Sequence, residues 1–191
     1  MLIATVIIIC IAVIIIATIV LLTQKGPEPI NNNTEFDKAV TLYLNPKTRQ
    51  KAADTYGMIE DWDTSRVTNM SMAFSDEKVG ARGFNADISK WDTSNVTNME
   101  RMFKGAAAFN APIGAWNVKN VENMKGMFDG AYSFNQNIGG WNVGKVRNMR
   151  HMFRNAKKFN KDVTQWKANE DIRTDAMLAG TEYERLNAVQ S

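Results

Sequence analysis

One phrase, repeated along the chain, constrains the fold more than any other feature. Trp91, Trp116, Trp141 and Trp166 follow one another at intervals of 25 residues, and Trp62 precedes Trp91 by 29. Around Trp91, Trp116 and Trp141 the neighbouring residues recur in register, as F-N-x-x-I-x-x-W-x-x-x-x-V-x-N-M-x-x-M-F. A fixed period of this length indicates units that stack and bury their apolar faces only against their neighbours.

Each repeat has the pattern of one helix and one short strand. Val96, Met99, Phe103 and Ala106 stand at the spacing of one helix face. A Thr-Ser pair before them would cap the helix start, and Gly105 would end the helix. The few residues before each tryptophan are too short for a second helix and predict a very short strand. We therefore expect an α/β fold, a short leucine-rich-repeat-like β/α solenoid of about four to five turns.

The recurring apolar residues are interpreted as the core of this stack. The rival interpretation makes the tryptophan column an exposed stripe on which sugars stack. The asparagine columns are expected to bind backbone groups at the bends. Residues one repeat apart should be neighbours, and opposite charges then face each other, as at Glu100 and Lys125 or at Asp129 and Arg154.

The beginning of the chain differs from the rest. The stretch from Leu2 to Leu22 has no charged residue, proline or glycine, and its 21 residues would span roughly 31 Å as a helix, about the thickness of a bilayer core. A cleaved signal peptide is the rival interpretation, but no Lys or Arg precedes the stretch and no small-x-small cleavage site follows it. We expect a single transmembrane helix before the solenoid. The basic residues from Lys25 onward favour, without fixing it, a cytoplasmic main domain.

Five segments are predicted along the chain. Phe36, Ala39, Val40 and Leu44 form one face of a helix that the pair Asn45-Pro46 would end. The predicted segments are a transmembrane helix at 1–23, a linker at 24–34, a helical N-terminal cap at 35–57, the repeat solenoid at 58–180 and a C-terminal cap or tail at 181–191.

The segment FNADISKWDTSNVTNMERMFKGA and its copies FNAPIGAWNVKNVENMKGMFDGA and FNQNIGGWNVGKVRNMRHMFRNA closely resemble the BspA-like leucine-rich-repeat surface proteins. The resemblance covers about residues 35–180. It implies an adhesion or interaction protein without known catalysis, of the kind found on bacterial and protist surfaces and in large DNA viruses. It transfers no catalytic residue, cofactor or metal ligand.

Composition and motifs argue against several function classes. A net charge of +3 gives no indication of nucleic-acid binding. Cys10 and His151 are the single cysteine and histidine, which excludes an internal disulfide and a Cys/His zinc site. The best carboxylate cluster is Glu60–Asp63, and its acids are interpreted as turn caps because a Trp-Asp corner recurs at Asp92. We therefore expect no enzyme.

The charge of the repeats is unevenly distributed. Residues 54–100 contain 9 acids and 4 bases, whereas residues 141–167 contain 8 bases and 1 acid. The candidate partner-binding residues are Arg150, Lys157, Lys158 and Lys161. A solvated face is the alternative meaning of such a run.

The expected function follows from these features together. We expect a non-enzymatic, single-pass membrane-anchored repeat protein that mediates protein–protein interaction at a cell surface. The alternative is a structural protein of a large DNA virus particle that links an internal membrane to the capsid. The expected partners are the membrane, through Leu2–Leu22, and another protein with an acidic surface or in a capsid.

Overall fold

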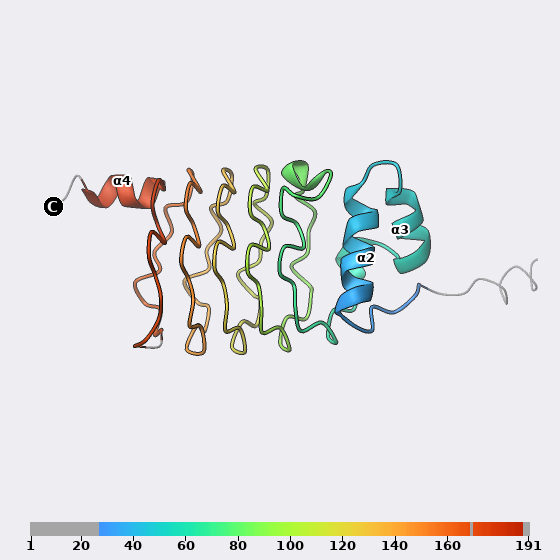
Figure 1. The fold of residues 1–191 in the computed structure, drawn as a ribbon, viewed down its shortest axis with the longest axis horizontal. Helices are drawn as coiled ribbons and strands as arrows, with labels where there is room; N and C mark the ends of the chain where they lie inside the picture. The colour runs from blue at the N-terminus through green and yellow to red at the C-terminus, as the bar shows by residue number, and fades with distance from the viewer. Residues whose placement is uncertain (1–26, 169, 189–191) are drawn as a thin grey trace, which may run out of the picture.

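The computed structural model describes residues 27–168 and 170–188. Two helices stand at one end, the repeats follow as turns stacked one behind another, and a short helix lies at the far end (Figure 1). The helices are α2 (Asn33–Leu44), α3 (Arg49–Tyr56) and α4 (Glu182–Ala188), with the 3-10 helices η1 (Ile59–Asp61) and η2 (Ala81–Gly83). The turns between Trp62 and Gly180 are called the stack below.

Helix α2 closes the N-terminal end of the stack. The side chain of Asn32 caps the helix by accepting a hydrogen bond from the N–H group of Glu35, at 2.9 Å. Helix α2 ends at Leu44, as the Asn45-Pro46 pair predicts. Its apolar face is buried, and Phe36 meets the ring of Trp91 edge-on, with centroids 5.5 Å apart.

The repeats contain neither of the two elements that their pattern predicts. Within the described part of the stack there is no α-helix and no strand, and η2 is its only helical segment. Neighbouring turns are joined by isolated parallel bridges, which pair Asn69 with Asn98, Asn98 with Asn123, Asn123 with Asn148 and Asn148 with Arg173. The prediction of an α/β fold with a β/α solenoid is therefore wrong.

Hydrogen bonds between turns explain why the expected helix does not form. The N–H group of Met99 donates to the carbonyl of Asn123 in the next turn, at 2.9 Å. Parallel bonds run from Arg101 to Lys125, from Phe103 to Met127 and from Gly105 to Asp129, at 2.8, 2.8 and 2.7 Å. Between these donors, the N–H groups of Met102 and Lys104 donate to carbonyls three residues earlier, at 3.2 and 3.1 Å. With Arg101 at φ 53, a helical path is interrupted, and every second donor reaches the neighbouring turn instead.

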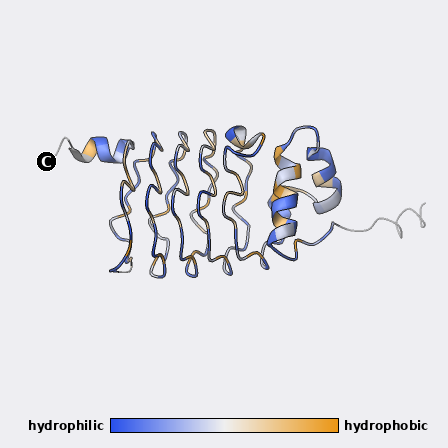
Figure 2. Ribbon diagram, in the orientation of Figure 1, coloured by the Kyte–Doolittle hydropathy of each residue, from blue (hydrophilic) through white to orange (hydrophobic). Residues whose placement is uncertain are grey.

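The apolar columns form the core, as predicted. Trp91, Trp116 and Trp141 are only 3–4% exposed, and the methionine and phenylalanine columns are buried with them. The phenylalanine rings stack within and between turns, with centroids 3.8 Å apart for Phe103 and Phe109. Apolar and polar residues alternate along each turn (Figure 2). The tryptophan column is therefore not an exposed stripe for sugars.

The membrane prediction needs correction. In residues 27–168 and 170–188 no helix combines the length and the apolar character that crossing a bilayer requires. The span predicted at Leu2–Leu22 lies outside the described residues. The prediction of a single-pass membrane protein at a cell surface or in a virion membrane rested on such a helix, and the described structure does not provide one.

Candidate functional site

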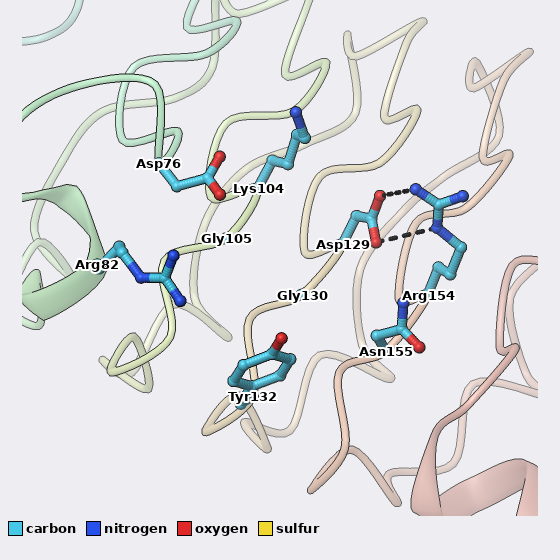
Figure 3. Close-up of a pocket in the computed structure, with 9 residues that line it drawn as sticks. All are labelled: Asp76, Arg82, Lys104, Gly105, Asp129, Gly130, Tyr132, Arg154 and Asn155. Atoms are coloured by element: carbon cyan, nitrogen blue, oxygen red, sulfur yellow. Dashed lines mark hydrogen bonds and ion pairs between the residues drawn. The ribbon is translucent and has the colours of Figure 1, made fainter.

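A hollow of about 230 Å³ opens on one side of the stack (Figure 3). It spans several turns, because its lining residues come from equivalent positions of successive repeats. These residues are Asp76, Arg82, Lys104, Gly105, Asp129, Gly130, Tyr132, Arg154 and Asn155.

The floor of the hollow is a column that lacks side chains in its middle. Asp76, Gly105, Gly130 and Asn155 occupy the same position in successive turns. Gly105 and Gly130 have φ values of +66 and +71, and a Cβ atom on Gly105 would lie 2.2 Å from the Asp76 carboxylate. Asp76 and Asn155 therefore stand at the two ends of the floor. The Asp76 carboxylate extends over Gly105, and Gly130 leaves its side-chain position open.

One wall of the hollow is a column of charged residues. The guanidinium of Arg154 binds Asp129 with two hydrogen bonds, of 3.1 Å from Nε and 2.6 Å from Nη2. This contact raises the pKa of Arg154 above its ordinary value. Lys104 turns the other way, and its Nζ lies 3.3 Å from Glu77. The expected pairing of Asp129 with Arg154 is confirmed.

The opposite wall is the column Arg82, Ala107, Tyr132 and Lys157. Backbone bonds connect these positions, since the carbonyls of Arg82, Ala107 and Tyr132 each accept an N–H bond from the following turn, at 3.0, 3.1 and 3.3 Å. Tyr132 is 42% exposed, and the ammonium of Lys157 lies 5.2 Å from its ring centroid. Arg82 is exposed and forms no ion pair within residues 27–168 and 170–188.

The family of the chain follows from its repeats. A family model described as "Mycoplasma protein of unknown function, DUF285" matches residues 48–110 and 78–189, which together cover most of the sequence. The chain belongs to the DUF285 family. This is the family of BspA-like surface repeat proteins, so the resemblance is confirmed at the level of the family. No curated protein and no solved structure matches the chain.

The DUF285 repeats place the four predicted binding residues in different surroundings. Arg150 belongs to the charge column of Glu100, Lys125 and Asp175, and its Nε lies 2.9 Å from Asp175. Lys157 covers Tyr132, at the edge of the hollow. Lys158 is exposed, Lys161 is partly exposed, and neither forms an ion pair in the described part of the chain. None of the four residues belongs to the lining of the hollow, and Lys157 is the one whose side chain contacts a lining residue, Tyr132.

Sequence reasoning missed the other residues of the hollow. Arg82 and Tyr132 are not in the basic run and were not predicted to bind anything. The signal was present in the DUF285 register, because Tyr132 stands 25 residues before Lys157 and Gly105 stands 25 before Gly130. Two glycines in adjacent turns beside an aromatic residue indicate a gap in the side-chain surface.

Two of the carboxylates near Trp62 have structural partners. Hydrogen bonds from the hydroxyl and the backbone N–H of Ser65 hold the pKa of Asp63 below its ordinary value. Asp61 lies 3.4 Å from the ammonium of Lys90. Among the described residues of the DUF285 chain, no three His, Cys, Asp or Glu side chains are grouped as metal ligands.

Proposed function

We propose that this chain is a non-enzymatic interaction module that binds another protein through the hollow and its tyrosine rim. The observation that carries the proposal is the column in which exposed Tyr132 stands between Arg82 and Lys157. Tyrosine and arginine are the residue types that contribute most at protein interfaces. The resemblance to BspA-like surface proteins supports the same class of function.

The charges at the hollow favour an acidic partner segment. Asp129 is neutralised by Arg154, so the wall that holds it adds little net charge. Of the lining residues, Arg82 has no carboxylate partner in the described part of the chain, and Lys157 adds a second positive charge beside Tyr132. The carboxylate of Asp76 lies at the far end of the floor. A free guanidinium binds a carboxylate with two parallel hydrogen bonds, and the tyrosine ring offers apolar contact area beside it. We infer that the partner presents an Asp or Glu side chain next to an apolar residue.

A peptide selection tests the proposal and does not require that the natural partner is known. A displayed library of random peptides is selected on the purified full chain, and binding of the enriched peptides is measured by fluorescence anisotropy. We expect enrichment of peptides that contain Asp or Glu. Tyr132→Ala and Arg82→Glu should each weaken their binding by tenfold or more, about 1.4 kcal/mol.

Arg147→Glu is the matched control for Arg82→Glu. Arg147 is also exposed and lies in the same stack, but outside the lining of the hollow. Peptides that bind the parent and all three variants equally would argue against this surface. Enrichment of peptides without acidic residues would argue against the proposed chemistry.

A further inference from the structure

In the segment that follows each parallel bridge, the hydrogen bonds between turns all point in the same direction. In each turn four alternate N–H groups donate to carbonyls of the following turn, toward the C-terminal end. The donors are Met70, Met72, Phe74 and Asp76 in the first turn, then Met99, Arg101, Phe103 and Gly105, then Met124, Gly126, Phe128 and Gly130, and then Met149, His151, Phe153 and Asn155.

The last turn repeats these donors without a following turn. The equivalent residues are Thr174, Ala176, Leu178 and Gly180. Gly180 donates to the carboxylate of Glu184 at 2.8 Å. The N–H groups of Thr174, Ala176 and Leu178 have no acceptor among residues 27–168 and 170–188. We call these three groups the donor edge.

The donor edge keeps the shape of an inner turn. Ala176 has φ 48 and Gly180 has φ 74, the left-handed values of the same positions one turn earlier. Leu178 takes the place of Phe153, which is fully buried, yet Leu178 is partly exposed. The repeat pattern stops here, since the next Phe-Asn position holds Glu184-Arg185 in α4. Helix α4 leaves the last turn at one corner and extends away from it (Figure 1).

The donor edge does not fit a second copy of this chain. Its carbonyls are already used, because those of Thr174, Ala176 and Leu178 accept bonds from within the turn, at 2.9, 3.4 and 3.1 Å. Two such edges would therefore set donors against donors. At the other end, the acceptor side of the first turn is covered by α2, whose residues Phe36, Ala39 and Val40 are buried.

We propose that the donor edge binds an uncovered first turn of another repeat array of the same type. Every inner interface of the stack has this form, with one turn supplying carbonyls at alternate residues and apolar side chains that cover the turn before it. The partner is a chain whose first turn has no helix across its acceptor side. It would accept bonds from Thr174, Ala176 and Leu178 and cover the side chain of Leu178.

Amide hydrogen exchange on the full chain tests this inference. The probe is a synthetic peptide of residues 116–140, whose carbonyls at 123, 125 and 127 accept bonds from the preceding turn in the intact protein. In the free chain, residue-resolved NMR should find fast exchange at Thr174, Ala176 and Leu178. Saturating peptide should slow exchange at these three groups by about tenfold or more, since exchange then requires opening of the complex.

A pair of leucine substitutions provides the control. Leu178→Lys should weaken peptide binding by about tenfold or more, because it places a charge on the contact surface. Leu186→Lys, on α4 and 50% exposed in the parent, should leave it unchanged. Arg82→Glu should also leave it unchanged, which separates this edge from the hollow.

Three results would overturn the inference. The first is unchanged exchange at all three groups with saturating peptide, which can be read on the parent even if Leu178→Lys does not fold. The second is equal protection by a scrambled peptide of the same composition, which would mean that any extended chain binds. The third is protection that rises with protein concentration alone, which would identify a second copy as the occupant.

Discussion

The indole Nε1 of Trp116 donates to the backbone carbonyl of Ile88, 28 residues earlier, at 3.0 Å. Trp141 and Trp166 make the same bond to Ile113 and Ile138, at 3.3 and 3.1 Å. Each tryptophan thus fills the core of its own turn and binds the backbone of the turn before it. The column joins successive turns as well as excluding water from them.

Truncation of a central tryptophan should strongly destabilise the stack. Trp116→Ala removes a side chain that is 4% exposed together with its hydrogen bond. We expect a loss of roughly 3–5 kcal/mol in the free energy of unfolding, measured by urea denaturation. Trp166→Ala is the control, since Trp166 lies in the last turn and is only partly buried, and its loss should be clearly smaller. Equal losses would mean that the column does not form a core.

Two glycines should respond oppositely to alanine. At Gly105, with φ +66, a Cβ atom would meet the carboxylate of Asp76 at 2.2 Å. Gly105→Ala should therefore lower the free energy of unfolding by about 1–2 kcal/mol for the left-handed conformation alone. At Gly83 nothing lies within 4 Å of a Cβ atom and φ is ordinary. Gly83→Ala should raise stability by about 0.4–1 kcal/mol, because it restricts the unfolded chain. Thermal unfolding of both variants measures these changes, and a tolerated alanine at Gly105 would contradict a left-handed backbone at that residue.

Two exposed aspartates should make the fold sensitive to acid. Bonds from the backbone N–H and the hydroxyl of Ser89 hold the pKa of Asp87 below its ordinary value, and Thr164 does the same for Asp162. A lowered pKa in the folded state stabilises the protein above the unfolded pKa of about 3.9, and this stability is lost as the pH falls through the folded pKa.

The double variant Asp87→Asn with Asp162→Asn should therefore lose less stability than the parent as the pH falls below about 4. Asparagine suits the position, because Asn137 makes the same turn bond to the N–H of Gly139 at 3.2 Å. Urea denaturation at a series of pH values measures the difference. Identical acid profiles of the two proteins would rule out a contribution from these turns.

Lys158 and Lys161, which belong to the predicted binding run, should affect binding and not folding. Lys158→Glu with Lys161→Glu reverses two charges that have no ion-pair partner in the described part of the chain. We expect an unchanged melting temperature and weaker binding of the acidic peptides selected on the parent. High salt should weaken binding to the parent as well, since the screening length falls to about 3 Å at 1 M. Salt-independent binding that survives the double substitution would mean that these residues belong to a solvated face and do not contact the partner.

The repeat register was predictable from the sequence, and the backbone between its landmarks was not. The 25-residue spacing correctly identified the buried Trp, Met and Phe columns and the contact of Glu100 with Lys125, at 3.4 Å. The prediction of a helix failed at Val96, Met99 and Phe103, because their spacing within one repeat also fits one face of a helix. The N–H groups of Met99 and Phe103 donate to carbonyls of the neighbouring turn instead of forming helical bonds, and a pattern within one repeat does not contain that neighbour. Gly126, four residues before Gly130, was the local sign of a second left-handed position.

The candidate site was less predictable than the core. The run of basic residues contains Lys157, whose ammonium lies against Tyr132, but it also contains Arg150, which Asp175 binds. The hollow depends on side chains that are absent, at Gly105 and Gly130, and absence is visible only after the turns are aligned and stacked. Tyr132 lines that gap.

The bonds between turns join residues about one repeat apart, as from Met99 to Asn123 and from Met124 to Asn148. Each added turn therefore closes a loop of nearly constant size, so its entropic cost does not grow with the length of the array. A turn can dock as soon as the preceding one is in place, because its partners are already formed. The chain can thus assemble in the order in which it is synthesised, and a longer array would need only more of the same step.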